Sequence, residues 1–117
     1  DEIGEILEKS PVVSAGFFEF GVEGAIRGFA EVGLRLDHVY GCETSPVAFL
    51  EGIYVCPEHR GSGIGRALLR SVQAWAEERG CRELGSDAHL ENVASHAFHE
   101  AFGFEETERV VFFRKLL

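Results

Sequence analysis

The sequence contains no methionine, only three prolines and one tryptophan, and no run of residues long and apolar enough to cross a membrane. A chain without methionine lacks its own initiator, so we expect a segment of the protein to precede residue 1. The start also shows no signal-peptide pattern. These absences predict a cytoplasmic protein with no membrane partner.

Basic side chains and cysteines are also few. Eleven lysines and arginines stand against twenty acidic residues, which gives a net charge of −9. Nucleic-acid phosphates require the opposite sign, so we exclude a nucleic-acid partner and expect a cationic substrate, unless the excess acid only keeps the protein soluble. Cys42, Cys56 and Cys81 have neither CxxC nor metal-ligand spacing, which predicts free thiols in a reducing compartment.

The composition supports one folded domain. A chain of 117 residues with 45% hydrophobic content can bury a core but has no room for a second one, so residues 1–117 form a single domain. The order of expected elements predicts an α/β (α+β) fold, with a mixed sheet and helices packed against its faces. The expected strands cover residues 12–20, 25–36, 47–55, 82–87 and 108–116, with a hairpin turn at 21–24; the expected helices cover residues 1–9, the stretch from the glycine turn to Gly80, and residues 92–102.

The most informative segment is the turn Arg60-Gly61-Ser62-Gly63-Ile64-Gly65, which lies between an apolar strand and an amphipathic helix. Its glycines leave no Cβ between a ligand and the backbone, and the N–H groups at a helix start favour an anion. The turn therefore predicts a diphosphate site, and the alternative is a plain strand-to-helix connection. A P-loop is excluded because Arg66 and Ala67 follow where Lys and Ser/Thr are needed, and a dinucleotide fold because it requires a second half.

Glu51 is the only charged residue in the apolar strand 47–55, where alternation places it on the face of Phe49, Ile53 and Val55. Burial of an unpaired carboxylate is costly and would make it a stronger base. Glu51 is therefore a candidate general base. The alternative is a carboxylate near the solvent edge of the sheet, or one paired with an arginine.

Two neighbouring features complete this region. Gly52 predicts a β-bulge or a close approach of a ligand to the backbone. Asp87 ends the next strand, at the edge where open α/β sheets bind ligands, so it could hold an ammonium group. The alternative for Asp87 is a role in a turn or helix cap.

The histidines do not indicate a metal site. His96 and His99 are three residues apart on the expected second helix, and two further donors with suitable spacing are missing, so we expect no metal. Asn92 stands at the start of the same helix, where it suits an N-cap.

The glycine turn resembles the acetyl-coenzyme A loop of the GNAT N-acetyltransferase superfamily, Arg/Gln-x-x-Gly-x-Gly/Ala, which Arg60, Gly63 and Gly65 match. The strings over residues 43–55, 86–92 and 103–113 look like one branch, the aminoglycoside 6′-N-acetyltransferases. The resemblance covers about residues 27–115. It implies a GNAT fold whose first strand and first helix are missing from this chain.

The resemblance also implies an enzyme that acetylates the 6′-amine of aminoglycosides with acetyl-coenzyme A and confers antibiotic resistance, and that forms a homodimer. Glu51, directly or through water, would take the amine proton, Asp87 would orient the substrate, and a backbone N–H near Ile53 or Tyr54 would stabilise the oxyanion. His99 stands where many family members carry a tyrosine that protonates the thiolate; the alternative is a histidine that fills a half-buried helix face. The implied coenzyme-binding residues are Ile53, Tyr54, Val55, Arg60, Gly61, Ser62, Gly63, Ile64, Gly65 and Asn92.

Two other functions remain open at this point. One is an acetyltransferase for another amine, such as a polyamine or a protein N-terminus, which the acidic composition suits equally well. The other is a coenzyme A-binding module that regulates a partner without catalysis. The two carboxylates, Glu51 and Asp87, argue against the binding module because it has no need of them.

Overall fold

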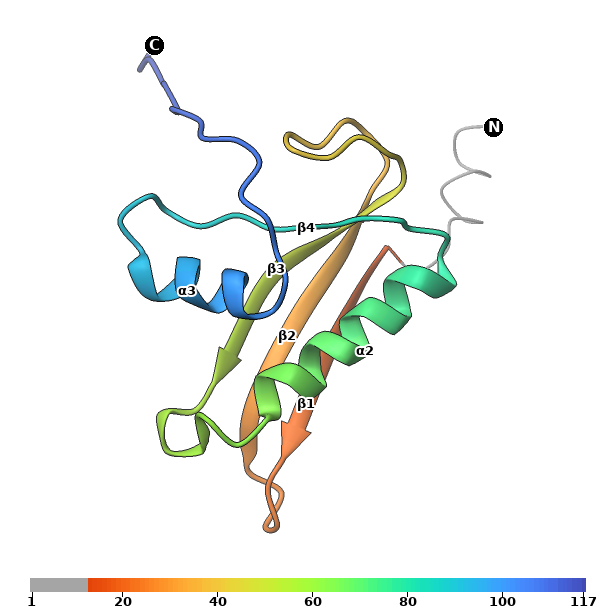
Figure 1. Ribbon diagram of the computed structural model, residues 1–117, viewed down its shortest axis with the longest axis vertical. Coiled ribbons are helices and arrows are strands. Elements are labelled where there is room, and N and C mark those ends of the chain that lie inside the picture. Colours follow the sequence, from red (N-terminus) through yellow and green to blue (C-terminus); the bar gives the residue numbers. More distant parts are fainter. Residues whose placement is uncertain (1–12) are drawn as a thin grey trace.

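The computed structural model describes residues 13–117, which form one mixed sheet and two α-helices (Figure 1). The sheet order is β1-β2-β3-β4, with β1, β2 and β3 antiparallel and β4 parallel to β3, so the sheet is mixed as the sequence predicted. The expected helix over residues 1–9 and the start of the first expected strand lie outside the described residues. The elements are β1 (Ser14–Phe20), β2 (Ile26–Arg35), β3 (Val47–Val55), the 3-10 turn η1 (Pro57–His59), α2 (Ile64–Glu78), β4 (Leu84–Gly85) and α3 (Val93–Ala101).

Helix α2 supplies most of the core, and the amphipathic pattern placed its inner face correctly. The side chains on that face are buried against β1, β2 and β3. Each fully buried aliphatic side chain of this kind contributes about 1.5–3 kcal/mol. Arg79 follows the helix and donates from Nη1 to the Trp75 carbonyl at 3.1 Å, which satisfies an orphan acceptor of the last turn. The buried residues of α2 are Ile64, Leu68, Leu69, Val72, Trp75 and Ala76.

Strand β3 contains a β-bulge at Glu51. Along β2, Glu31 pairs with Gly52, and the next residue, Val32, pairs with Leu50. Glu51 is therefore an extra residue with no partner opposite it. The bulge expected beside Gly52 is confirmed.

The bulge shifts the alternation of β3 by one residue. Leu50 is buried before it, whereas Ile53 and Val55 pack against the same core after it. The predicted common face of Glu51 with Ile53 and Val55 is therefore wrong. Glu51 lies with Phe49 on the face away from α2, since Arg35 contacts both side chains there.

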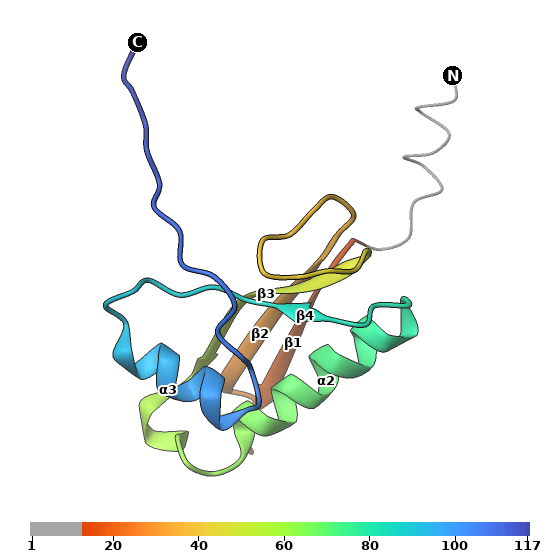
Figure 2. The ribbon, with the colours of Figure 1, turned by 45° about the horizontal axis from the view of Figure 1, so that its top comes forward.

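Both described α-helices lie on the same side of the sheet (Figure 2). Phe98 and Phe102 of the α3 region pack against the core that α2 closes. The strands expose a row of aromatic rings, Phe20, Phe18, Phe29 and Tyr54, with centroids of successive rings 6.1–6.3 Å apart.

Two expected strands differ from the structure. β4 is two residues long rather than the expected 82–87, because its pairing with β3 ends at Phe49 and Gly85, just before the bulge bends β3 away. Residues 108–116 form no strand and run exposed away from the sheet (Figure 1). Thr107 lies against Gly41, and the residues that follow it do not run beside β4. Residues 108–116 therefore have no neighbouring strand among the described residues.

A carboxylate fixes the loop before β3. Glu83 accepts hydrogen bonds from the backbone N–H of Glu43 at 2.9 Å and of Thr44 at 2.7 Å, and from the Thr44 hydroxyl. Hydrogen bonds from Thr44 hold the pKa of Glu83 below its ordinary value of 4.5. Burial is the main reason that the pKa of the nearby Cys42 thiol is raised, with Glu83 adding to the effect.

We expect Glu83→Gln to lower the stability of the fold in a pH-dependent way. Because the pKa of Glu83 is lower in the folded than in the unfolded state, the ionised carboxylate stabilises the fold above the unfolded-state value, and this contribution is lost as the pH falls through the folded-state value. The urea midpoint of the variant should lie below that of the wild type near pH 7 and approach it near pH 3. Glu23→Gln, at an exposed position in the β1–β2 turn, is the control. A difference that stays constant down to low pH would contradict this role.

Candidate active site

The glycine turn adopts backbone conformations that favour glycine. Gly61 and Gly63 have φ of +80° and +88°, and a Cβ at either position would meet no protein atom within 4 Å. Gly65 lies inside α2, where a Cβ would contact Val55, Phe98 and Phe102 at 3.7–3.9 Å. The first two glycines therefore shape an open turn, and the third allows close packing of the helix.

The unpaired backbone N–H groups of this turn indicate an anion site. None of the amides of residues 61–66 donates a hydrogen bond to another residue in the described part of the chain. Gly63, the N-cap of α2, offers no side-chain cap, and the first bond that closes the helix runs from Ala67 to Gly63. The unpaired amides and the positive end of the helix dipole together favour a phosphate group here.

The polar side chains of the turn hold its shape. Arg60 donates from Nε to the Val55 carbonyl at 3.0 Å, and its guanidinium lies 5.6 Å from the centroid of the Tyr54 ring. The Ser62 hydroxyl donates to the His59 carbonyl. Arg60 thus ties the turn to the end of β3, and it carries its positive charge at the residue that precedes the free amides.

Beyond the bulge, β3 has a free edge on the side of β4. The backbone N–H of Cys56 donates to the carbonyl of Arg27 in β2. Because successive N–H groups of a strand point to opposite sides, the N–H of Tyr54, two residues earlier, also points toward β2. The N–H groups of Ile53 and Val55 then point away from β2, toward the gap that β4 leaves after Gly85. The strands β3 and β4 thus separate after Phe49 and Gly85, and Ile53 and Val55 rather than Tyr54 offer N–H donors to the gap between them.

Glu51 is not a buried, unpaired base. One of its carboxylate oxygens lies 2.7 Å from Nη2 of Arg35, and its side chain is 39% exposed. The Arg35 guanidinium also lies 4.2 Å from the centroid of the Phe49 ring. The sequence left two interpretations of Glu51 open, a buried base and a carboxylate near solvent or paired with an arginine, and the geometry agrees with the second. The sequence did not identify Arg35 as the partner.

Asp87 lies at the same edge as Glu51. Phe49 and Gly85 are the last pair between the parallel strands β3 and β4, and Glu51 and Asp87 each follow that pair by two residues. Asp87 is exposed and makes no recorded hydrogen bond or ion pair to another described residue. Its carboxylate is therefore open to a cation that approaches this edge.

His99 is hydrogen-bonded through both ring nitrogens. Nδ1 lies 2.6 Å from the carbonyl of Ser95, which can only accept, so Nδ1 carries a proton. Nε2 lies 2.7 Å from the hydroxyl of Ser86, which donates to it when the ring is neutral. The ring packs edge-on against Phe98 and Phe104. Ser86 is a further neighbour that the sequence reasoning missed, although it directly precedes Asp87.

Asn92 is the N-cap of α3, since its Oδ1 accepts from the Ser95 N–H at 3.0 Å. The amide NH2 group of Asn92 donates to no other described residue, so capping leaves it available to a ligand. The structure shows the capping role, and it is compatible with a contact to a coenzyme.

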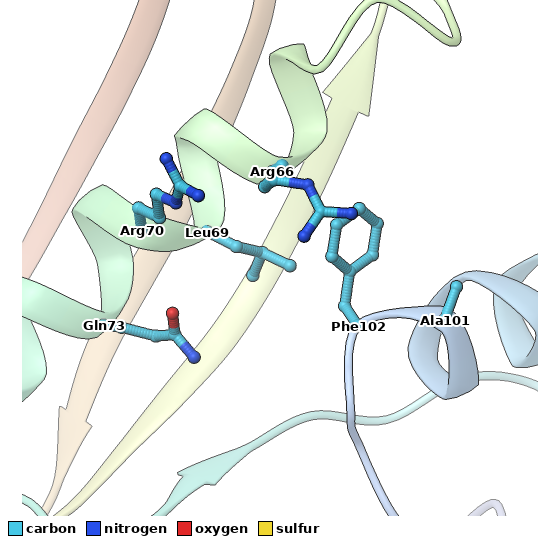
Figure 3. Close-up of a pocket in the computed structure, with 6 residues that line it drawn as sticks. All are labelled: Arg66, Leu69, Arg70, Gln73, Ala101 and Phe102. Atoms are coloured by element: carbon cyan, nitrogen blue, oxygen red, sulfur yellow. The ribbon is translucent and has the colours of Figure 1, made fainter.

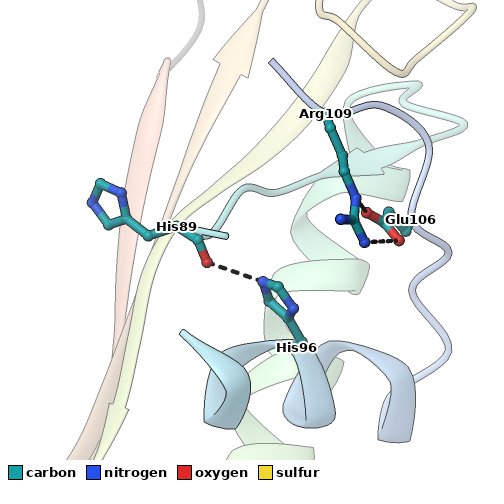
Figure 4. Close-up of polar contacts among 4 residues, drawn as sticks. All are labelled: His89, His96, Glu106 and Arg109. Carbon is teal, nitrogen blue, oxygen red and sulfur yellow. Dashed lines mark hydrogen bonds and ion pairs between the residues drawn. The ribbon is translucent and has the colours of Figure 1, made fainter. Parts of the chain in front are cut away.

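The other histidines of this region serve structure. His96 Nε2 lies 3.0 Å from the carbonyl of His89 and ties the loop before α3 to that helix (Figure 4). Arg109 pairs with Glu106 in the segment after α3 and holds the pKa of Glu106 below its usual range. Within residues 13–117, no group of three or more His, Cys, Asp or Glu side chains is placed to hold a metal ion, and no helix is long and apolar enough for a membrane span. The three cysteines are free.

The candidate residues therefore gather at one edge of the sheet without a direct bond between them. Glu51 and Asp87 follow the last β3–β4 pair, and Ser86 links that edge to His99. No hydrogen bond or ion pair among the described residues joins Glu51, Asp87 and His99 to one another. The free amides of the glycine turn lie beyond the C-terminal end of β3, so an extended ligand in the gap would connect them with this edge.

The chain has similar proteins of known activity. Residues 6–104 match the model of the acetyltransferase (GNAT) family. An aminoglycoside N(6′)-acetyltransferase type 1 of Stenotrophomonas maltophilia is 60% identical over 100 residues, which are 86% of this chain and 65% of that protein. The enzyme of that name from Serratia marcescens is 53% identical over 116 residues, which are 99% of this chain and 78% of that protein. The chain thus spans just under two thirds of the first relative and somewhat more of the second.

Solved structures show the same architecture. The structure of AAC(6′)-Iy in complex with the bisubstrate analogue CoA-S-monomethyl-acetylneamine is 45% identical, with a TM-score of 0.85 over 99% of this chain and 77% of that one. The aminoglycoside 6′-N-acetyltransferase AAC(6′)-IG from Acinetobacter haemolyticus is 41% identical, with a TM-score of 0.86 over 99% of this chain and 78% of that one. The fold predicted from the sequence is confirmed.

We expect Gly63→Ala to weaken the binding of coenzyme A about tenfold. The new Cβ would project into the open space before the free amides, and the positive φ would strain the turn by about 1–2 kcal/mol. Gly24→Ala is a matched control, because Gly24 has a φ of +82° and open space around it but lies in the β1–β2 turn. Calorimetric titration of both variants should show a loss for Gly63→Ala alone. Equal affinities would remove this turn from the binding site.

Proposed function

The chain belongs to the acetyltransferase (GNAT) family, and from this premise we propose that it transfers the acetyl group of acetyl-coenzyme A to the 6′-amino group of aminoglycoside antibiotics, which confers resistance to them. The observation that carries the proposal is the likeness to aminoglycoside N(6′)-acetyltransferases, which extends over nearly the whole chain. The acidic composition suits a polycationic substrate of this kind.

The coenzyme lies along β3 in this proposal. The free amides of Gly61, Ser62, Gly63, Ile64 and Gly65 bind the diphosphate, with the positive charge of Arg60 beside them. The pantetheine arm enters the gap between β3 and β4, where the N–H groups of Ile53 and Val55 and the amide of Asn92 are open to it. The thioester then reaches the edge that carries Glu51 and Asp87.

Glu51 and Asp87 receive the substrate. A protonated amine has no lone pair for attack, so a base must remove its proton before the C–N bond forms. Glu51 takes this proton, directly or through water, and the incoming ammonium competes with Arg35 for the carboxylate. When the ammonium displaces Arg35 from Glu51, Arg35 keeps its contact with the Phe49 ring and therefore stays close to the site. In this proposal Asp87 orients the cation, and the Ile53 N–H stabilises the oxyanion.

The leaving thiolate needs a proton once the C–S bond breaks. In neutral His99 the only N–H, at Nδ1, is engaged by the Ser95 carbonyl, and Nε2 accepts from Ser86. His99 can therefore act as the acid only as an imidazolium, whose Nε2 proton passes to Ser86 while the Ser86 proton passes to sulfur. Ser86 is thus the group through which His99 would reach the thiolate.

The exposed C-terminal segment supports a homodimer. Val111, Phe112 and Phe113 are 76%, 88% and 91% exposed, and residues 108–117 are extended without a neighbouring strand among the described residues. Apolar, β-prone residues in such a position are an aggregation hazard unless another chain covers them. A second copy can do so by pairing this segment with the free edge of its sheet at β4. The three free cysteines support a location in the reducing cytoplasm, which cell fractionation tests.

The assay that tests the proposed activity compares amine substrates. We expect rapid release of thiol from acetyl-coenzyme A with kanamycin or tobramycin and slow release with spermidine. Glu51→Gln should lower turnover at least tenfold with little change in coenzyme A affinity, because the substitution removes the base and leaves the glycine turn intact.

Glu19→Gln is the matched control for Glu51→Gln. The Glu19 carboxylate pairs with Arg27 at 2.8 Å, is 37% exposed and lies on β1, which is separated from β3 by β2, so the variant breaks a comparable ion pair that includes neither Glu51 nor Asp87. If Glu51→Gln were as active as Glu19→Gln, Glu51 would not be the base. Thiol release with spermidine but not with aminoglycosides would instead assign the chain to polyamine acetylation, and coenzyme binding without turnover of any amine would make it a binding module.

We expect the combined substitutions Val111→Lys and Phe113→Lys to convert the dimer into a monomer. Two charges on one side of the extended segment would oppose its burial against another chain. Sedimentation of the wild type, this variant and Val22→Lys measures the mass; Val22 is fully exposed at the β1–β2 turn and serves as the control. A wild-type monomer, or a variant that remains dimeric, would rule out this interface.

A further inference from the structure

A second candidate binding feature lies beside the glycine turn. A cavity of about 250 Å³ opens between α2 and the end of α3 (Figure 3). None of the residues assigned above to the chemistry lines it. The lining residues are Arg66, Leu69, Arg70 and Gln73 of α2, with Ala101 and Phe102 at the end of α3.

The cavity is positively charged in an acidic protein. Arg66 and Arg70 are four residues apart on α2, so they project from the same side of the helix. The ion pairs recorded within residues 13–117 involve Arg27, Arg35, Arg79 and Arg109, and neither lining arginine is among them. Two guanidinium groups therefore border this cavity without a carboxylate from the described residues, although the chain carries a net charge of −9.

The walls of the cavity hold one of these charges in place. The Arg66 guanidinium lies 5.4 Å from the centroid of the Phe102 ring (Figure 3). Such a contact restrains the side chain and leaves its N–H groups available to an anion. Leu69 is buried at the base, and Gln73 supplies an amide that can also donate. The arrangement combines two cations and an amide donor, which is the chemistry that recognises a phosphate monoester.

The position of the cavity identifies the phosphate. Arg66 directly follows Gly65, the last residue whose amide is assigned to the diphosphate, and Gly65 packs near Phe102. Coenzyme A carries its third phosphate on the 3′-hydroxyl of the ribose that is attached to this diphosphate. A coenzyme bound to the turn therefore brings a phosphate monoester, with a charge of about −2 at neutral pH, one ribose away from the cavity.

We propose that Arg66 and Arg70 bind the 3′-phosphate of coenzyme A in the cavity between α2 and α3, so that the protein distinguishes the coenzyme from its 3′-dephospho form. The proposal rests on the coenzyme site of the proposed function and adds a specificity-determining pair to it. The tether to the diphosphate raises the effective concentration of the 3′-phosphate at the arginines. The attraction between partly exposed charges weakens as salt is added.

Calorimetric titration of the full chain with coenzyme A and with 3′-dephospho-coenzyme A tests this pair. The wild type should bind coenzyme A about tenfold or more tightly than the dephospho form, the difference expected for one or two charge-assisted hydrogen bonds. The double variant Arg66→Gln/Arg70→Gln should bind both forms with the affinity that the wild type has for the dephospho form. Both arginines are exposed, so the variant should keep the wild-type melting temperature.

Arg82→Gln/Arg114→Gln is the matched control, because it removes the same charge from exposed positions outside this cavity. Equal wild-type affinities for the two coenzymes, or an equal loss for both in the Arg66/Arg70 variant, would overturn the proposal. Inorganic phosphate lacks the tether and should bind more weakly than the coenzyme; phosphate that bound as tightly would assign the cavity to a free anion and overturn it as well. A wild type that binds neither coenzyme would refute the proposed function itself, which is a different result.

Discussion

The β-bulge at Glu51 is the constraint on which the arrangement of the candidate site depends. One extra residue shifts the alternation of β3, so that Glu51 leaves the core side while Ile53 and Val55 remain packed against it. The same shift turns the N–H groups of Ile53 and Val55 toward β4 just where β4 has separated. The bulge is therefore the common cause of two features: the backbone N–H groups that can pair with a ligand and the accessible carboxylate of Glu51.

The features that the sequence predicted well are local. The 3.6-residue period of α2 identified its buried face, and glycines marked the β1–β2 turn and the glycine turn, because each of these features depends on a few consecutive residues. Gly52 even indicated the bulge, since a residue without a side chain is common at such irregularities. The fold class followed from the order of these elements.

The features that the sequence did not predict depend on contacts between distant segments. The face of Glu51 required the register between β2 and β3, and its partner Arg35 is sixteen residues away. The link from Ser86 to His99 required the placement of α3 against the end of β4. Residues 108–116 have the composition of a strand, but a strand also needs a neighbour, and strand composition alone does not show which chain supplies it.

The start of α2 has a consequence for the folding equilibrium. Helix α2, which supplies most of the core, follows its N-cap Gly63, and no group of the described residues accepts a hydrogen bond from the amides of residues 61–66. A bound anion fills these sites only in the folded state, so ligand free energy adds to the free energy of unfolding by thermodynamic linkage. Under the proposed function this ligand is acetyl-coenzyme A, so the resistance of the fold to proteolysis rises with the concentration of that ligand.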